Sequence, residues 1–441
     1  MIVGRALHFL SFALRHHRGT FRVFNTGYLF AQSARQSFRR WQSRQTCPSD
    51  SESILPVRAV TRGPLQHFFG YYDKCPWDQS GHRLLALEAP RIWRTPRPGD
   101  EVTVGWIEPQ NGQEFHPIAK SKAWNWQQGC MLQWLGTPAG EKVFYNDFRA
   151  DKYVGVIRSA NGNSEEQVLE RPLYAPVPDG RSGVSVDFER LHRCMPGYGY
   201  SARVRHIDAR LLPDDDGIWG VDTATGKSTL LVSLSQLGKL APRPCMSGAE
   251  HYINHLQFSP GGQSLAFLHR WHIDGSYYSR LYTMRADGSE LRCVADSDLV
   301  SHYNWLDDQH ILAWARQPGL GDHFYLYDIS KTSSCPAILG ESLLTEDGHP
   351  SYSPDKQFLL VDTYPDEEQR QHLFVFNLNL RTKVELGCFR QPLRFNDDIR
   401  CDLHPRWNRD GTMICFDSTH DGLRQIYMLD VEPWLRRQES E

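Results

Sequence analysis

The stretch His349-Pro350-Ser351-Tyr352-Ser353-Pro354-Asp355 joins an aromatic residue to a Ser-Pro-Asp turn, and it decides the fold because variants of it recur along the chain. The apolar run Phe358–Val361 follows it and is typical of a buried β-strand. The first residues of the recurring turns are Trp77, Trp134, Val177, Phe258, Trp305, Tyr352 and Trp407. The sequence therefore predicts seven copies of one structural unit.

Each turn is followed by two apolar runs, as Phe258 is followed by Ser264–Leu268 and Leu281–Met284. Strands joined by Asp-Gly and Pro-Asp turns, with a repeat of roughly 40–50 residues, are typical of β-propeller blades. The long interval between Val177 and Phe258 predicts an insertion, which we place at about residues 193–216. We therefore predict an all-β, seven-bladed β-propeller over residues 55–441, closed by a strand near Leu55 to Val60.

The first 54 residues differ in composition from the rest. Residues 1–49 hold eight arginines and no acidic residue, and Ser43–Ser53 is rich in serine. We assign residues 1–54 to a basic N-terminal extension and linker, with a transit peptide or a membrane-surface helix as alternatives. The apolar stretch Ala6–Leu14 is far shorter than the ~20 residues of a membrane-spanning helix, so no transmembrane span is expected.

Composition narrows the function. The formal net charge of −3 gives no reason to expect nucleic acid as a partner. The ten cysteines include no Cys-x-x-Cys pair, which favours a reducing compartment, and we expect a cytoplasmic location. The chain has no Gly-x-Ser-x-Gly motif and no residual length for a hydrolase domain, which excludes a propeller-type peptidase. No carboxylate pair at a defined spacing supports a glycoside hydrolase.

Four histidines occupy one position of the repeat, three residues before its aromatic: His255, His302, His349 and His404. The first strand of a propeller blade lines the central channel, so this position predicts a half-ring of imidazoles. The first three blades place Lys74, Met131 and Tyr174 there. Imidazole is a common metal ligand and a general base near neutral pH, so we predict a divalent metal site. The alternative is a structural hydrogen-bond network near the turns.

Further polar residues share the predicted channel. Arg270 follows the inner strand of the fourth blade and is expected to bind a carboxylate in bidentate fashion, with a surface ion pair as the alternative. Tyr72 belongs to an aromatic stretch whose alternative role is core packing. Five residues, some of them in or beside the insertion, are candidate substrate contacts: Lys74, Gln128, His192, Arg193 and Tyr200.

Three runs, Asn254–Phe258, Ser301–Trp305 and Gly348–Asp355, resemble the last blades of oligogalacturonate lyases, which are propellers of the wider TolB-like class with WD40-like repeats. Ulvan lyases are a more distant resemblance. In architecture the resemblance covers roughly residues 58–432, and in motif detail residues 250–410.

The resemblance implies a divalent metal ion, Mn²⁺ or Zn²⁺, with His302 and His349 as ligands. It also implies His255 as the base and Arg270 as the partner of a carboxylate. The Gln-x-x-His-x-His run of the family is here Glu346–Ser351, so either His404 or Glu346 has to replace a missing histidine.

The resemblance implies a lyase that cleaves a uronic-acid-containing polysaccharide or oligosaccharide by metal-assisted β-elimination. Removal of the C5 proton requires that the adjacent carboxylate is neutralised by the metal or by Arg270. It also requires a base, here His255, and an acid for the leaving oxygen, here Tyr72. The alternative is a non-catalytic propeller that binds a polysaccharide or a partner protein, because the fold hosts both kinds of function.

Overall fold

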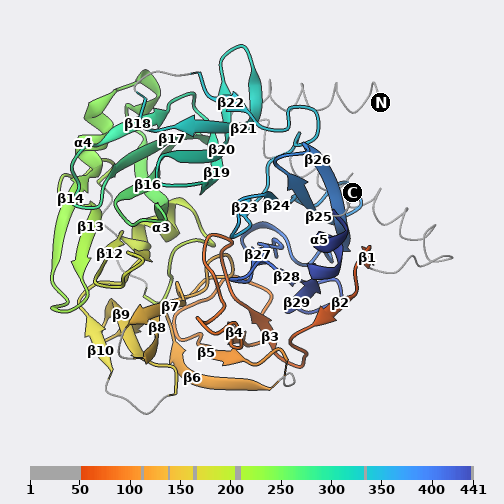
Figure 1. The fold of residues 1–441 in the computed structure, drawn as a ribbon. Helices are drawn as coiled ribbons and strands as arrows, with labels where there is room; N and C mark the ends of the chain where they lie inside the picture. The colour runs from red at the N-terminus through yellow and green to blue at the C-terminus, as the bar shows by residue number, and fades with distance from the viewer. Residues whose placement is uncertain are drawn as a thin grey trace, which may run out of the picture. The chain divides into compact units, whose positions relative to one another are not determined.

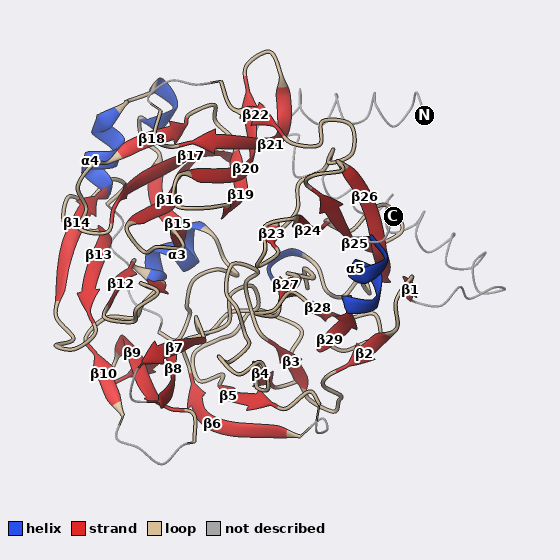
Figure 2. Ribbon diagram, viewed as in Figure 1, coloured by secondary structure: helices blue, strands red, loops and turns tan. Residues whose placement is uncertain are grey.

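In the computed structural model the described residues are 51–110, 114–137, 140–161, 166–203, 210–331 and 335–438. Residues 51–438 form seven antiparallel sheets that stand side by side in a ring (Figure 1). The predicted all-β, seven-bladed propeller is therefore confirmed. The α-helices of this part of the chain are short (Figure 2): α3 (Phe188–Cys194), α4 (Leu234–Leu240) and α5 (Glu432–Gln438). Of the predicted basic extension and linker, residues 1–54, the first 50 lie outside the described residues.

Each blade is an antiparallel meander whose first strand is the one nearest the channel. Blade 1 contains β3 (Gln66–Phe68), β4 (Leu84–Ala89), β5 (Val102–Ile107) and β6 (Phe115–Ser121). Blade 2 contains β7 (Gln133–Thr137), β8 (Gly140–Arg149), β9 (Lys152–Ser159) and β10 (Gln167–Leu169). Blade 3 contains β11 (Ala175–Pro176), β12 (Ser182–Ser185), β13 (Gly217–Asp222) and β14 (Ser228–Ser233).

The last four blades follow the same order. Blade 4 contains β15 (Glu250–Phe258), β16 (Ser264–Ile273), β17 (Ser276–Arg285) and β18 (Arg292–Ala295). Blade 5 contains β19 (Val300–Trp305), β20 (His310–Gln317), β21 (Gly321–Asp328) and β22 (Ala337–Ile338). Blade 6 contains β23 (Ser351–Tyr352), β24 (Phe358–Asp362), β25 (Arg370–Asn377) and β26 (Thr382–Arg390). Blade 7 contains β27 (Arg406–Trp407), β28 (Met413–Ser418) and β29 (Gln425–Asp430).

An N-terminal strand closes the ring, as predicted. Strand β2 (Val57–Ala59) pairs with β29 and becomes the outer strand of blade 7. Strand β1 (Ser51–Ser53) pairs with β26 and adds a fifth strand to blade 6. The residues of β1 lie within the segment that we assigned to the extension and linker. They cover strand β26, which would otherwise be an exposed edge.

The aromatic residues of the repeat join neighbouring blades. Indole N–H groups of three of them donate to a carbonyl of the preceding blade, at 2.7 Å from Trp134 to Pro76, 3.1 Å from Trp305 to Gln257 and 3.1 Å from Trp407 to Ser351. In every case the acceptor directly precedes the repeat aromatic of the earlier blade. This repeated bond fixes the register between adjacent blades.

One face of the ring gathers the polar residues that the sequence singled out. Because consecutive strands are antiparallel, the turn between the second and third strands of a blade lies at the end where its first strand begins. We call this end of the ring the mouth face. It carries the observed insertion between β12 and β13, which includes α3 and so begins before the predicted residue 193. No described helix is long and apolar enough to cross a membrane.

Substitution of Trp305 tests the inter-blade bond. Trp305→Phe keeps a ring between the blades but removes the donor to the Gln257 carbonyl, so we expect a loss of about 1–3 kcal/mol in the free energy of unfolding. Trp77→Phe is the matched control, because the buried indole nitrogen of Trp77 has no hydrogen-bond partner among the described residues. Chemical unfolding of both variants measures the difference. Equal losses would show that the hydrogen bond contributes nothing beyond ring volume.

Candidate functional site

The four histidines of the repeat form one contiguous cluster in the channel. Ring centroids lie 4.3 Å apart for His302 and His349, and 4.4 Å apart for His349 and His404. His255 and His302 lie at bulges of β15 and β19, whereas His349 and His404 each lie two residues before the start of β23 and β27. All four histidines are buried, with at most 4% of each residue exposed.

The backbone at this position is strained in three blades. His255 has a φ of 51°, His404 a φ of 43° and Met131, at the same position of blade 2, a φ of 56°. Non-glycine residues with such values cost about 1–3 kcal/mol each and cluster at functional sites. The left-handed conformation at His255 and His404 turns their side chains out of the regular alternation of the strand.

Two tyrosines fill the space that the histidines surround. The ring centroid of Tyr71 lies 4.9 Å from His404 and 5.2 Å from His255, and that of Tyr72 lies 5.0 Å from His349. Their segment leaves strand geometry at Gly70, whose φ of 134° brings it so close to Gln128 that a Cβ would lie 3.0 Å from the Gln128 backbone. The half-ring is therefore packed against aromatic rings.

The predicted base and acid are adjacent. The Tyr72 hydroxyl lies 3.3 Å from His255 Nε2 and donates to the Tyr303 carbonyl at 2.9 Å. Burial, with the nearby His302 and Lys74, lowers the pKa of His255 well below its usual value. Burial raises the pKa of Tyr72 well above its usual value. Near neutral pH the imidazole is therefore unprotonated and the phenol protonated.

Arg270 brings a positive charge to the mouth face beside these residues. Its Nε donates to Asn254 Oδ1 at 2.9 Å, and its side chain makes no ion pair with a described carboxylate. The alternative reading of Arg270 as half of a surface ion pair is not observed. Burial lowers the pKa of His302 although the Asp347 carboxylate raises it, and the Arg270 charge adds to the lowering, which places Arg270 near the cluster.

Three residues of the cluster could hold a metal ion. His349, Asp402 and His404 each offer a ligand atom, and these atoms all lie within 4.8 Å of one another. The Nε2 atoms of His349 and His404 are buried without a hydrogen-bond partner among the described residues. Their Nδ1 atoms are held by Asp362 Oδ1 at 2.8 Å and by the Gly70 carbonyl at 2.9 Å. This is how ligating imidazoles are oriented in metal sites, so the residues fit a divalent ion.

The Asp362 carboxylate positions both histidines of this group. Its Oδ1 accepts from the backbone N–H and from Nδ1 of His349, each at 2.8 Å, and its Oδ2 accepts from the backbone N–H of His404 at 3.0 Å. Burial alone would lower the pKa of His349, but the Asp362 carboxylate outweighs it and raises that pKa. Asp362 is thus a positioning residue that the sequence analysis missed.

His302 lies beside this group but is not one of the three. Its Nδ1 lies 2.9 Å from Asp347 Oδ1 and its Nε2 lies 3.4 Å from the Tyr364 hydroxyl. We predicted that either His404 or Glu346 takes the place of the second histidine of the family motif. His404 lies in the group with His349, whereas Glu346 is exposed and lies outside the group. Asp402, two residues before His404, replaces His302 in the observed set. The role of His302 as a ligand stays a prediction.

The predicted substrate contacts divide into two sets. Lys74 forms a buried ion pair with Asp73 at 2.9 Å, Gln128 donates to the Tyr174 hydroxyl at 2.8 Å, and the Tyr200 hydroxyl accepts from Asn146 at 2.9 Å. These three side chains are no more than 8% exposed and contact protein groups. His192 and Arg193 are half-buried in α3 on the mouth face. The substrate contacts of all five stay predictions.

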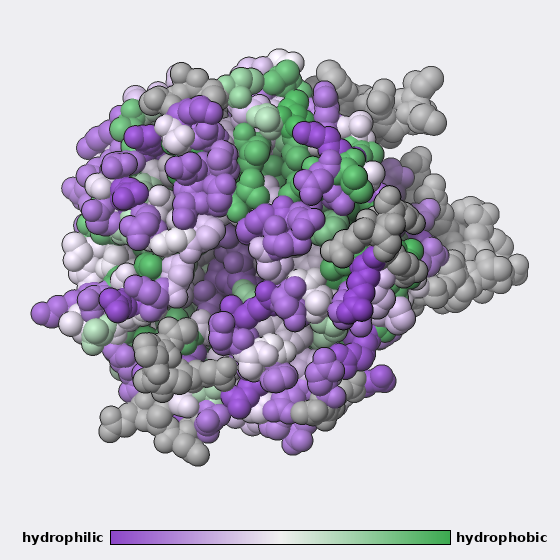
Figure 3. Space-filling model, viewed as in Figure 1, coloured by the Kyte–Doolittle hydropathy of each residue, from purple (hydrophilic) through white to green (hydrophobic). Residues whose placement is uncertain are grey.

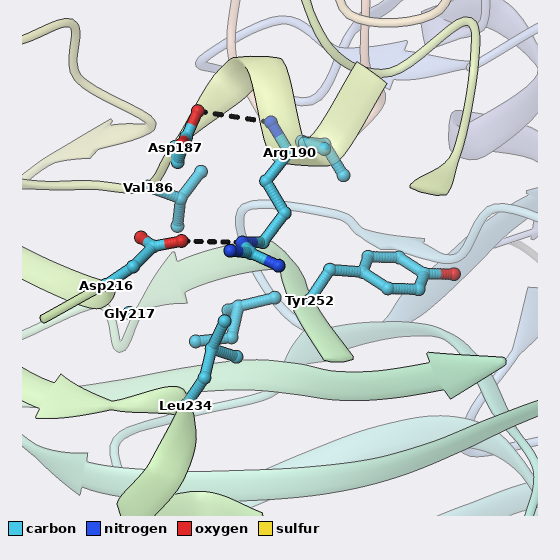
Figure 4. A pocket seen from close by; sticks show the side chains of 9 residues that line it. Val186, Asp187, Arg190, Asp216, Gly217, Leu234 and Tyr252 are labelled. Carbon is cyan, nitrogen blue, oxygen red and sulfur yellow. Dashed lines mark hydrogen bonds and ion pairs between the residues drawn. The ribbon is translucent and has the colours of Figure 1, made fainter. Parts of the chain in front are cut away.

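Two hollows lie near these residues. Figure 3 shows the ring hollowed at its centre, with hydrophilic residues around the hollow. Between α3 and β15 there is a smaller cavity of about 10 Å³, lined by Arg190, Asp216 and Tyr252 among others (Figure 4). It has room for about one water molecule. The Arg190–Asp216 ion pair at 2.6 Å holds α3 to blade 3, so this small cavity is structural.

A second group of potential metal ligands lies on the outer surface of blade 6. It consists of His372, Glu385 and Cys388. The imidazole is already paired, with Nδ1 at 3.2 Å from Glu385. Burial raises the pKa of the Cys388 thiol, although Arg370 beside it acts in the opposite direction. An uncharged thiol does not favour a cation, so we assign no metal there.

Comparison with known proteins supports the fold. No protein-family model matches the sequence, and no curated protein matches it. Among solved structures, the oligogalacturonate lyase of Vibrio parahaemolyticus is similar with a TM-score of 0.60 at 13% identity, over 86% of this chain and 96% of that chain. An oligogalacturonate lyase in complex with manganese is similar with a TM-score of 0.61 at 16% identity, over 86% and 94%.

A third structure, TolB from Acinetobacter baumannii, has a TM-score of 0.39 at 14% identity, over 80% of this chain and 81% of that chain. At identities this low, the likeness to the two oligogalacturonate lyases shows a shared fold and no more. The predicted resemblance to oligogalacturonate lyases is thus confirmed for the fold, and the resemblance to ulvan lyases stays a prediction.

Asp362→Asn tests the metal site through its positioning residue. The amide can accept from only one side, so we expect Mn²⁺ or Zn²⁺ affinity in isothermal titration to fall by roughly 10–100-fold. His310→Ala, which removes a half-exposed histidine paired with Asp307, should leave the affinity unchanged. Unfolding curves establish that both variants are folded, and His349→Gln provides a second disruption of the same group. Equal affinities in all variants would contradict the site.

Proposed function

We propose that this protein is a lyase that cleaves a uronic-acid-containing oligosaccharide or polysaccharide by metal-assisted β-elimination. One observation carries the proposal: His255, whose pKa burial lowers, Arg270, which has no carboxylate partner among the described residues, and the group of His349, Asp402 and His404 converge in one channel. The likeness to two oligogalacturonate lyases supports it, because their fold is the one that forms this channel.

The ligand group accounts for the first requirement of the reaction. His349, His404 and Asp402, with His302 beside them, would hold a divalent ion such as Mn²⁺ or Zn²⁺, which when bound would supply Lewis-acid stabilisation of the charge on the uronate. Arg270 binds the same carboxylate through its guanidinium, since paired N–H groups match the two oxygens. With the uronate carboxylate neutralised in this way, the C5 proton would be more acidic.

The proton transfers belong to His255 and Tyr72. Unprotonated His255 accepts the C5 proton, and its lowered pKa keeps it available at neutral pH. Tyr72 is protonated and lies 3.3 Å from His255 Nε2, so it donates to the leaving oxygen. Both side chains are buried, and Tyr198 meets Tyr71 edge-on at 6.1 Å.

The second candidate function is a non-catalytic propeller that binds a polysaccharide or a partner protein. The packing of Tyr71 and Tyr72 against all four histidines favours it, because these ring contacts suffice to explain why the imidazoles are buried. In that case the histidines stabilise the channel and the metal-ligand geometry has no catalytic use.

Ultraviolet absorbance of the unsaturated sugar product separates the two functions. The full chain, loaded with Mn²⁺ or Zn²⁺, is incubated with a panel of uronate polymers and their oligomers. Product that disappears on chelation and returns with metal supports the lyase. Tight binding of a uronate polymer by the metal-loaded protein without any product would establish the non-catalytic function instead.

His255→Gln tests the assignment of the base. Gln preserves the size and polarity of the side chain but cannot take up the C5 proton, so we expect kcat to fall by roughly 10²–10⁴-fold. Metal content should stay the same, because His255 is outside the ligand group. His420→Gln is the control, since that buried histidine lies in blade 7 and pairs with Ser418 at 2.8 Å. A wild-type kcat in His255→Gln would remove His255 from the mechanism.

A further inference from the structure

An exposed indole stands on the mouth face, away from the histidines. Trp93, in the connection between β4 and β5, is 39% exposed. The Arg394 guanidinium lies 4.7 Å from its ring centroid, and the Phe395 ring meets it edge-on at 5.3 Å. Arg394 in turn donates to the Gly422 carbonyl. The indole is therefore held in one orientation while part of its surface stays open to solvent.

The segment that carries Arg394 leads directly to the channel. It connects β26 to β27 and contains Arg400, which pairs with Asp402 at 2.5 Å and lies 4.6 Å from the ring centroid of Tyr364. The Tyr364 hydroxyl is 3.4 Å from His302 Nε2. A series of side-chain contacts along one segment thus joins the indole to the histidine cluster.

Two hydrogen bonds from the connection between β6 and β7 hold the Trp93 segment and the Arg400 segment in place. The Trp126 indole donates to the Arg94 carbonyl at 2.8 Å, one residue after Trp93. The neighbouring Gln127 donates through its side chain to the Arg400 carbonyl at 3.0 Å. Trp93 and Arg400 are therefore parts of one rigid surface, and a ligand that binds both does not have to order a loop.

The chemistry of this surface matches an acidic sugar. An open indole face packs against the C–H groups of a pyranose ring, and a guanidinium pairs with a carboxylate. Arg91, Arg97 and Arg394 are exposed, whereas the charge of Arg94 is balanced by Asp100 at 2.5 Å. Asp397 and Asp398 lie in the same segment and limit the positive charge to the surroundings of Arg394. A carboxylate is therefore favoured close to Arg394.

We propose that Trp93 and Arg394 form an outer subsite for one uronate residue of an oligosaccharide that continues into the channel. The direction of the chain rests on the proposed function, but the binding itself requires no turnover. An acidic oligomer long enough to reach Trp93 from the channel gains the indole and guanidinium contacts, and a short one does not. The subsite thus selects for chain length and for charge.

Calorimetry in the His255→Gln background tests the subsite without consuming the sugar. The probes are digalacturonate, hexagalacturonate and hexamannuronate, with maltohexaose as the neutral probe. We expect Trp93→Ala to weaken the binding of an acidic hexamer about tenfold and the binding of digalacturonate less than about twofold. Arg394→Gln should weaken the hexamer similarly and reduce the salt dependence of its binding, because its contact is ionic.

Two controls lie in the turn between β25 and β26, at the opposite face of blade 6. Leu380→Ala removes an exposed apolar side chain and Arg381→Gln an exposed guanidinium, and neither should change hexamer affinity. Trp93→Phe keeps an aromatic face and should restore most of the affinity lost in Trp93→Ala. Equal hexamer affinity in wild type and Trp93→Ala would overturn the subsite, as would hexamer losses of the same size in the two controls.

The outcomes also separate the subsite from the proposed function. Hexamer binding that depends on Trp93, in a protein whose wild type releases no unsaturated product, supports the subsite and removes the lyase. Unsaturated product formed by a protein in which Trp93→Ala changes no affinity overturns the subsite and keeps the lyase. Binding of maltohexaose as tight as that of the acidic hexamers overturns the selection for uronate.

Discussion

The aromatic residue of the repeat is the constraint on which the rest of the structure depends. Buried between two blades, it sets how far each first strand is displaced along the channel relative to its neighbour, and in three blades its indole N–H bonds the preceding blade. A residue three positions earlier must then face the channel at nearly the same level in consecutive blades. Four histidines from four blades meet for this reason, although the chain separates His255 from His404 by more than a hundred residues.

A buried ion pair lies beside these histidines. Arg406 and Asp417 form an ion pair at 3.1 Å with both side chains 2% exposed, and Arg406 Nε also donates to the Tyr71 carbonyl at 3.2 Å. Desolvation of such a pair offsets much of its attraction, so it adds specificity more than stability. Here the specificity is the position of the tyrosine segment, which Arg406 holds against the histidines through its backbone.

The sequence predicted the seven blades, the closing strand and the histidine cluster because each is a consequence of repetition. Residues that lie the same number of positions before the turn of each blade lie at the same height in the channel, so the repeat alone predicts that these histidines lie close together. Asp362 and Asp402 were missed because a carboxylate is recognised as a partner only when the three-dimensional neighbour is known. Tyr71 belongs to the same aromatic stretch as Tyr72, which the sequence singled out, but its place inside the half-ring was not predicted. The repeat position places side chains around the channel and does not say which irregular segment enters it, and Gly70 marks that departure.

Strands β1 and β2 couple the N-terminal end of the described chain to two blades. They are consecutive in sequence but belong to blades 6 and 7, whose first strands are preceded by His349 and His404. Tension on the N-terminal side would therefore unzip the three-residue pairing of β1 one hydrogen bond at a time before it reached the pairing of β2. A tether at this end would load the two blades that supply these histidines, while the other five blades would feel the force only through them.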